Sequence, residues 1–183
     1  MLSNLDVRQI ARPFMEELAE YSRASVSIGI RDRLSMVYVE TVRSSAPIGL
    51  QHGVGARLPL ATTAIGRAYL SSLPQSERSF LLDQIRIRDE SLWPRTKAGI
   101  EQGLRDYTER GFCISTGDWN PEIVAVGVPF VGPDGTIMAF NCGGPAYILT
   151  REKLEDDIGP KLLHLVKRVG HLLGQSEINK SGK

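Results

Sequence analysis

Three segments of the sequence carry polar side chains that could bind or transform a small molecule. In the first, Thr62 and Thr63 precede Ala64 and Ile65 at the start of an expected helix. A helix N-terminus offers unpaired backbone N–H groups and the positive end of the helix dipole, so a carboxylate or another anion can dock there. Threonines at this place also serve as ordinary N-caps. The segment alone therefore predicts either an anion site or a simple cap.

The second segment runs from Gly111 to Glu122 and includes an expected turn between two strands. Turn formation explains most of its residues, but Trp119 is an aromatic side chain in a polar loop, and such side chains often cover a pocket or meet a partner. Half-buried packing explains Trp119 equally well. Asp118 and Glu122 form the best acidic pair for catalysis, yet neither belongs to a recognisable reaction motif.

The third segment ends an expected strand with Asn141, Cys142, Gly143 and Gly144. Glycines here let a ligand approach the backbone closely. The two-residue alternation of a strand places Asn141 and Gly143 on one face and Cys142 on the other, so Asn141 and Cys142 are not expected to share a site. Cys142 could act as a nucleophile only with a histidine that the local sequence does not supply.

Other chemistry has little support in the sequence. It contains neither a G-x-S-x-G elbow nor a phosphate-binding P-loop. Its three histidines lack the spacing of a zinc site. Cys113 and Cys142 both fall in strands that are expected to be buried, which favours two small core residues over a disulfide. We expect no metal and no cofactor, and an enzyme remains a minority interpretation.

Hydrophobic periodicity predicts the elements that must position these residues. Helices are predicted at 7–21, 64–73, 75–85, 97–110 and 151–173, and strands at 25–30, 34–42, 112–116, 122–131 and 136–143. Pro13 and the pair Gly159-Pro160 are expected to bend or interrupt their helices, and Gly111 to end one. This order predicts an α+β domain with a largely antiparallel sheet.

The composition is that of a folded protein without a strong charge bias. The 183 residues are 42% hydrophobic and 23% charged, with a formal net charge of +1. Nucleic-acid binding by this chain alone is therefore disfavoured. Apolar stretches such as 123–131 are too short to cross a bilayer, and there is no secretory signal, so a cytoplasmic protein without a membrane partner is expected. We divide the chain into a connecting helix region at 1–22, one domain at 23–174 and a flexible tail at 175–183.

Taken together, several short motifs resemble the effector-binding domain of IclR-family transcription regulators over nearly the whole chain. In order, they are Arg12-Pro13 before a helix, Val37-Tyr38-Val39, Leu58-Pro59 through Ala68, Arg110-Gly111-Phe112, Ala125 through Pro129, Asp134-Gly135 and Gly143-Gly144-Pro145. The resemblance implies a GAF-like fold, in which a curved antiparallel sheet with flanking helices holds a small-molecule pocket on one face. It also implies a homodimer or homotetramer that binds DNA through an N-terminal winged helix-turn-helix. That module is absent here, so we expect the chain to be the separated C-terminal part, with Met1 and some of the tail as additions.

The resemblance also implies which residues line the pocket. They are Leu58, Ala64, Ile65, Ser115, Ala125, Asn141 and Gly143. Adding Thr62, Thr63 and Trp119 from the segments above completes the predicted effector site. Relatives often have an acidic cluster where this chain has Ser115 through Trp119, and serines at the positions of Asn141 and Gly143. The polar lining here therefore differs from theirs, and the resemblance implies a pocket without identifying its ligand.

These observations predict a transcription regulator whose domain reversibly binds a small organic or aromatic acid. Thr62 or Thr63 and the backbone amides would hold the carboxylate, while Asn141 and Ser115 would bond the remainder. Two alternatives remain. One is a small enzyme that uses Cys142 or Asp118, and the other is a dimerisation module that responds to no ligand.

Overall fold

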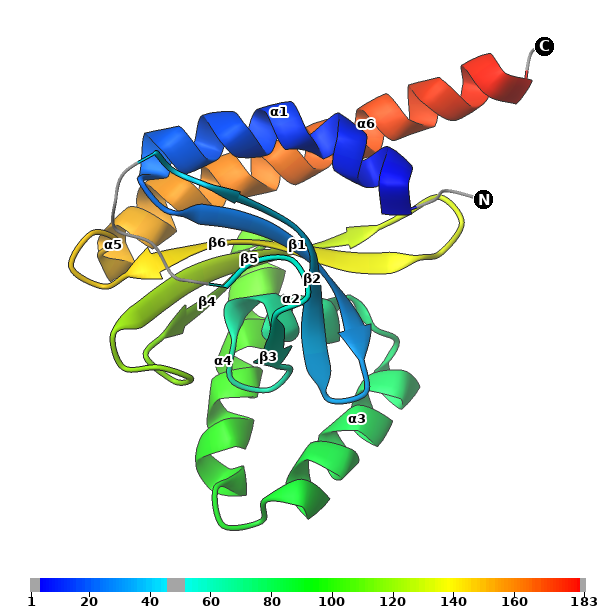
Figure 1. Cartoon of the computed structure of the whole chain (residues 1–183). Coiled ribbons are helices and arrows are strands. Elements are labelled where there is room, and N and C mark those ends of the chain that lie inside the picture. The colour runs from blue at the N-terminus through cyan, green and yellow to red at the C-terminus, as the bar shows by residue number, and fades with distance from the viewer. Residues whose placement is uncertain (1–3, 46–51, 182–183) are drawn as a thin grey trace.

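The computed structural model describes residues 4–45 and 52–181, and its elements alternate between strands and helices (Figure 1). In chain order they are α1 (Asn4–Ser22), β1 (Ser25–Asp32), β2 (Ser35–Arg43), β3 (Arg57–Pro59), α2 (Ala64–Ser72), α3 (Gln75–Arg88), α4 (Trp93–Arg110), β4 (Cys113–Thr116), β5 (Ile123–Val131), β6 (Ile137–Pro145), α5 (Arg151–Lys153), a π-helical turn (Leu154–Ile158) and α6 (Gly159–Ser181). None of the helices within the described ranges is both long and apolar enough to cross a membrane.

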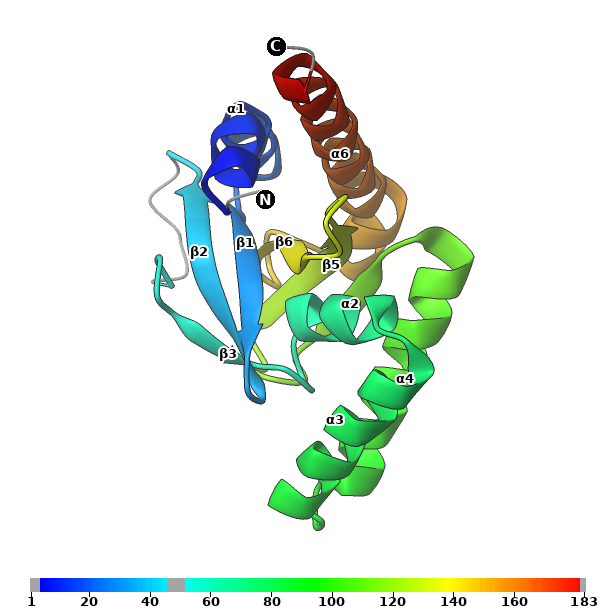
Figure 2. The same cartoon turned by 90° about the vertical axis from the view of Figure 1, so that its right-hand side faces the viewer.

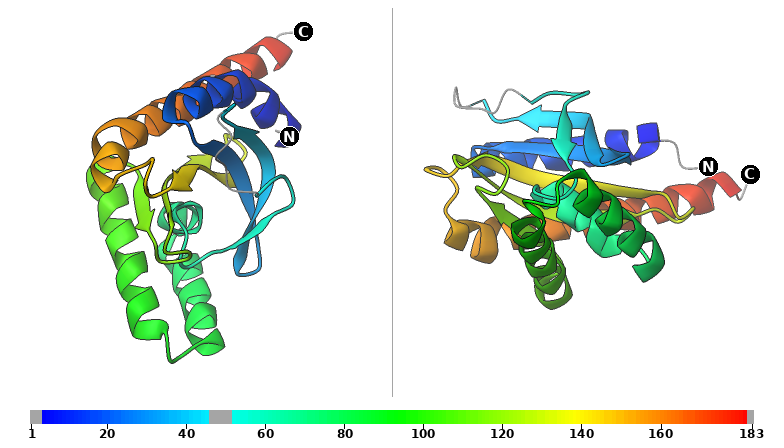
Figure 3. Two further views of the ribbon diagram at one scale, coloured as in Figure 1. Left: turned by 60° about the vertical axis from the view of Figure 1, so that its left-hand side comes forward. Right: turned by 90° about the horizontal axis from the view of Figure 1, so that it is seen from below.

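The six strands form one sheet in the order β3-β2-β1-β6-β5-β4, and every neighbouring pair is antiparallel. Helices α1 and α6 lie side by side over one face, which we call the outer face (Figures 1 and 2). The sheet curls around α2, which lies against the opposite, inner face, and the α3–α4 hairpin projects beyond α2 (Figure 3). The predicted α+β, GAF-like arrangement is confirmed.

The two faces of the central sheet differ in side-chain size because β1, β5 and β6 alternate large and small residues. On β5, Val126 and Val128 belong to the core beneath α1 and α6, whereas the intervening Gly127 faces α2. A Cβ atom at Gly127 would overlap the carbonyl oxygen of Ala64, so only glycine lets α2 lie this close to the sheet. Small inner-face residues thus bring the start of α2 against the strands.

A β-bulge in β2 turns the polar residues of this strand toward two different sites. Ile28 pairs with Glu40 but its neighbour Gly29 pairs with Tyr38, which leaves Val39 as an extra residue. In a regular strand, Tyr38 and Glu40 would face the same side. Because of the bulge, Tyr38 packs in the inner core with α2, while Glu40 faces α1 and pairs with its arginines.

The helices differ from their predicted bounds mainly at prolines. Helix α1 continues through Pro13, because its buried face spans both sides of the proline, with Ala11 and Met15 in the outer core. Residues 1–22, predicted as a connecting region, thus include a helix that packs on the domain. Helix α4 begins at Trp93, four residues earlier than predicted, with Pro94 in its first turn where the missing N–H costs nothing.

The break predicted at Gly159-Pro160 is absorbed by the π-helical turn, after which Pro160 lies in the first turn of α6. Helix α6 continues to Ser181, past Gln175 where the predicted tail begins. No proline follows Pro160 to end it earlier. The short strand β3 was not predicted, because it forms only by pairing with the start of β2.

Candidate functional site

A cavity of about 40 Å³ lies between the inner face of the sheet and the start of α2. Eight of the ten residues predicted at the site line it, namely Leu58, Thr63, Ala64, Ser115, Trp119, Ala125, Asn141 and Gly143. Thr62 instead lines a separate groove beside β3 and α3, and Ile65 is buried against Gly29 of β1. Consecutive helical residues point in directions about 100° apart, so Ala64 and Ile65 cannot both face the cavity.

Five lining residues were not predicted, and they are Ser25, Ser27, Tyr38, His52 and Ile123. The two serines alternate with the buried Val26 and Ile28, which is a signal that the sequence does contain. Their place follows from strand pairing, since Ser27 lies opposite Asn141 and Ser25 lies opposite Gly143.

Asn141 is one of the buried polar residues that line the cavity. Its side chain is buried, and its Nδ2 donates to the hydroxyl of Tyr38 at 2.8 Å. Its Oδ1 has no hydrogen-bond partner among the described residues. Burial raises the pKa of Tyr38 to about 12, so its hydroxyl stays protonated. As predicted, Cys142 faces the other way, into the outer core beside Ser22.

The hydroxyl groups at the start of α2 are already engaged. Thr63 is the N-cap: its hydroxyl donates to the carbonyl oxygen of Pro59 at 2.6 Å and accepts from the amide of Gly66 at 3.2 Å. Ser115 donates to the carbonyl oxygen of Thr62 at 3.0 Å. The donors that the helix start offers to a ligand are therefore the backbone N–H groups that precede Gly66, whose own amide is bound by the Thr63 cap.

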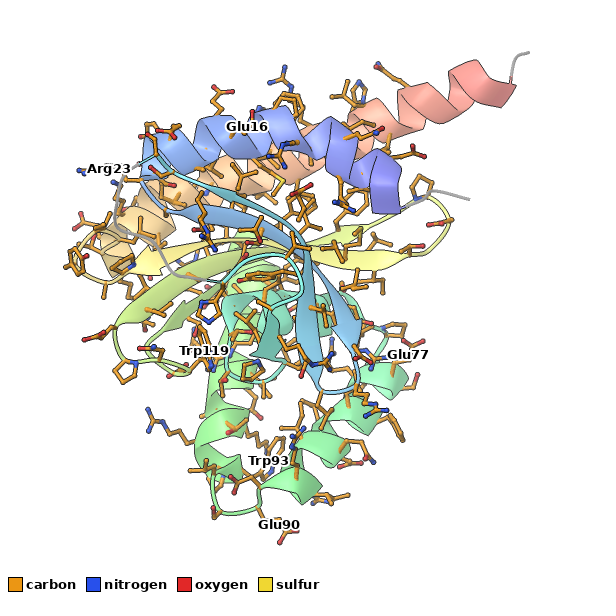
Figure 4. All side chains as sticks on the ribbon, in the orientation of Figure 1. Glu16, Arg23, Glu77, Glu90, Trp93 and Trp119 are labelled. Carbon is orange, nitrogen blue, oxygen red and sulfur yellow. The ribbon has the colours of Figure 1, made fainter. Side chains whose placement is uncertain are left out.

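Two aromatic rings from different loops meet at the cavity. His52 and Trp119 make an edge-to-face contact with ring centroids 5.2 Å apart, and His52 Nδ1 has no partner among the described residues. The Trp119 side chain lies on the side of the sheet that faces α2 and α4 (Figure 4).

The loop that carries Trp119 is tied to α2 through its neighbour Asp118, whose carboxylate pairs with Arg67 at 2.8 Å. The Arg67 side chain is only 4% exposed and runs against Gly99 and Gly103 of α4. A larger side chain at Gly99 would occupy the space of the guanidinium group, and one at Gly103 would crowd the aliphatic part of the Arg67 side chain. The ion pair thus joins α2, α4 and the β4–β5 loop beside the cavity.

Among the described residues the cavity offers groups that can recognise a ligand, and Cys142 and Asp118, the predicted candidates for catalysis, do not line it. Both cysteines are free and buried, and burial raises the pKa of Cys113 to about 12 and that of Cys142 to about 11, far above the pKa of an activated thiol. Asp118 is committed to Arg67. Within the described part of the chain, no lysine or arginine lines the cavity, and no three His, Cys, Asp or Glu side chains are grouped to hold a metal.

Comparison with known proteins gives one consistent picture. Residues 1–171 match the family model "Bacterial transcriptional regulator IclR C-terminal". The chain is 30% identical over 169 residues to the HTH-type transcriptional regulator TsaQ1/TsaQ2 of Comamonas testosteroni. The matched region covers 90% of this chain and 60% of that protein.

Solved structures agree. An IclR-family transcriptional regulator from Brucella abortus superposes with a TM-score of 0.90 at 42% identity, over 93% of this chain and 64% of that one. The C-terminal domain of Escherichia coli KdgR, at 21% identity and a TM-score of 0.70, shares the fold over 92% of this chain and 99% of its own. The chain spans about 60% of the length of TsaQ1/TsaQ2.

Proposed function

Because this chain belongs to the IclR family of bacterial transcriptional regulators, as its sequence resemblance indicated, we propose that it is the effector-binding and oligomerisation domain of such a regulator. A small organic acid binds reversibly in the cavity and changes how the complete protein binds DNA through an N-terminal winged helix-turn-helix. The observation that carries this proposal is the cavity itself, where a buried oxygen of Asn141 that has no partner among the described residues lies with the first turn of α2.

The first turn of α2 supports an acid as the ligand. With the Thr63 hydroxyl engaged as a cap, the carboxylate rests on the backbone N–H groups near Ala64, where the helix dipole is positive. A buried water needs about 10–15 Å³ of such space, so 40 Å³ corresponds to roughly three water molecules. A benzene-sized cavity has about 150 Å³. The smaller the acid, the less the walls of the cavity must move to admit it, so the volume favours a short-chain acid over an aromatic one.

A path of contacts leads from the cavity to the N-terminal helix. Tyr38 lines the cavity, and beyond the bulge Glu40 accepts from Arg12 at 3.0 Å and from Arg8 at 3.4 Å, both on α1. A ligand that moves β2 would thus change the position of α1 on the sheet, and with it the position of any segment ahead of α1. It can do so only as far as it binds one arrangement more tightly than the other.

Assembly into a homodimer or homotetramer is the second part of the proposal. The α3–α4 hairpin projects from the body and exposes the apolar side chains of Phe80, Ile87 and Leu92. Exposed apolar groups gathered on one projection are typical of association surfaces. Light scattering after gel filtration gives the subunit number, and Ile87→Asp is expected to lower it. If the wild type and the Ile87→Asp variant are both monomers, this part of the proposal is contradicted.

Calorimetric titration with short-chain and aromatic carboxylates tests the sensor. Binding of at least one acid to the wild type, weakened tenfold or more in Asn141→Ala, is expected. Ser71→Ala is the matched control, because this α2 hydroxyl bonds the carbonyl oxygen of Arg67 outside the cavity. Absence of binding by every acid would favour a ligand-independent dimerisation module, and turnover of an acid would favour an enzyme.

A further inference from the structure

The amide of Asn141 contacts its neighbours through its nitrogen. Its Nδ2 donates to Tyr38, whose hydroxyl is protonated and also has the Ser27 hydroxyl as a hydrogen-bond neighbour. Ser27 lies directly opposite Asn141 on β1, and its own hydroxyl contacts that of Thr41 at 3.1 Å. With Nδ2 committed, Oδ1 is the amide atom left for a ligand.

A buried carbonyl oxygen without a donor is unfavourable by an amount comparable to a lost hydrogen bond. A ligand that donates to it removes this penalty, whereas a carboxylate placed there would bring two acceptors together. Asn141 is 7% exposed, so little solvent reaches this group. The carboxylate must therefore lie away from Asn141, toward the N–H groups near Ala64.

We propose that the effector is a short hydroxy acid, whose hydroxyl donates to Oδ1 of Asn141 while its carboxylate accepts from the first turn of α2. The inference rests on the proposed acid sensor and adds a second requirement, a hydrogen-bond donor on the opposite end of the ligand. Asn141 is then the residue that separates a hydroxy acid from the deoxy acid of the same length. A hydroxy acid of few atoms requires the least widening of the cavity.

Matched probes separate the two requirements. Three pairs of acids differ only in one hydroxyl group, namely glycolate and acetate, lactate and propionate, and 3-hydroxybutyrate and butyrate. The uncharged 1,2-propanediol is similar to lactate in size and carries hydroxyl groups but no carboxylate. Dissociation constants for the 183-residue protein are measured by calorimetry. The hydroxy member of at least one pair is expected to bind about tenfold more tightly than its partner, as one unsatisfied buried acceptor would require.

Two variants assign the preference to Asn141. Asn141→Leu removes the acceptor and keeps a similar side-chain length, so the ratio within each pair is expected to fall to about one. Tyr38→Phe leaves the amide in place without its partner, and the ratio is expected to shrink there as well. Ser71→Ala is expected to keep the wild-type ratio. Circular dichroism melting curves of each variant establish that it is folded.

Each outcome has one meaning. Equal binding within every pair, or tighter binding of the deoxy acid, overturns the hydroxy-acid inference and leaves the acid sensor standing. Binding of 1,2-propanediol as tight as that of lactate overturns the acid requirement and leaves the role of Asn141 standing. A hydroxyl preference that survives in Asn141→Leu overturns the assignment to Asn141. No binding by any probe counts against both.

Discussion

Arg67 on α2 and Asp118 in the β4–β5 loop form an ion pair of 2.8 Å, with the arginine side chain 4% exposed and the aspartate side chain 34% exposed. The arginine Nε also donates to the carbonyl oxygen of Ala61 at 3.1 Å, so the guanidinium group is anchored on two sides. Because Asp118 directly precedes Trp119, this pair fixes both the helix that begins at the cavity and the loop that covers it.

Replacing Asp118 by Asn is expected to destabilise the protein. The change leaves the Arg67 charge buried without its counter-ion, and partial exposure of Asp118 moderates the loss to about 1–3 kcal/mol. Urea unfolding measures it. The control is Glu101→Gln, which removes a half-exposed partner of Lys97 and should change stability by less than about 0.5 kcal/mol. Equal stability of the two variants would contradict a structural role for the buried pair.

Glu40→Gln is expected to loosen α1 from the sheet. It removes a nearly buried carboxylate that two α1 arginines share, at a cost of about 1–2 kcal/mol, because Arg8 and Arg12 can partly turn to solvent. Amide hydrogen exchange should rise in α1 more than in α4. The control Glu16→Gln affects only the exposed pair of Glu16 with Arg12, and unchanged exchange in both variants would argue against the link.

Gly127→Ala tests the close approach of α2 to β5. The added methyl group would overlap the Ala64 carbonyl oxygen, so the strands or the helix must shift, at a cost of about 2–3 kcal/mol. Thermal melting provides the comparison with Gly170→Ala in α6, where the new Cβ would lie 3.6 Å from Phe130. That control should be neutral or stabilising, by up to about 1 kcal/mol, because alanine favours helix. A Gly127→Ala protein as stable as the wild type would refute the tight contact.

Alkaline pH is expected to weaken the fold through its buried thiols. Burial raises the pKa of Cys113 from 9.0 to about 12 and that of Cys142 from 9.0 to about 11. Both groups are largely neutral in either state below about pH 8. Above it the unfolded chain loses these protons first, so the free energy of unfolding falls as pH rises toward 11.

The loss between pH 9 and 10 is expected to be on the order of 1–2 kcal/mol for the two thiols together, measured by urea unfolding in the presence of a reducing agent. The Cys113→Ala/Cys142→Ala protein should show a shallower pH dependence. A wild-type stability that stays constant to pH 10 would contradict the raised pKa values.

The sequence by itself determined what depends on near neighbours. Strand alternation placed Asn141 and Cys142 on opposite faces, the Thr63 N-cap and the glycine at 111 marked helix ends, and the order of elements predicted the sheet. These features follow from the two- and 3.6-residue periods and from turn chemistry, which act over only a few residues.

Only the tertiary structure decided which groups meet at the cavity. One extra residue at Val39 turns Tyr38 inward and Glu40 outward, and no local pattern indicates where a bulge falls. The pairings of Asn141 with Tyr38, 103 residues apart in the chain, and of Arg67 with Asp118 likewise depend on strand register and on how closely α2 can approach the sheet. Such contacts are set by packing among distant segments, and that is why the sequence supplied the residue types of this site but not their partners.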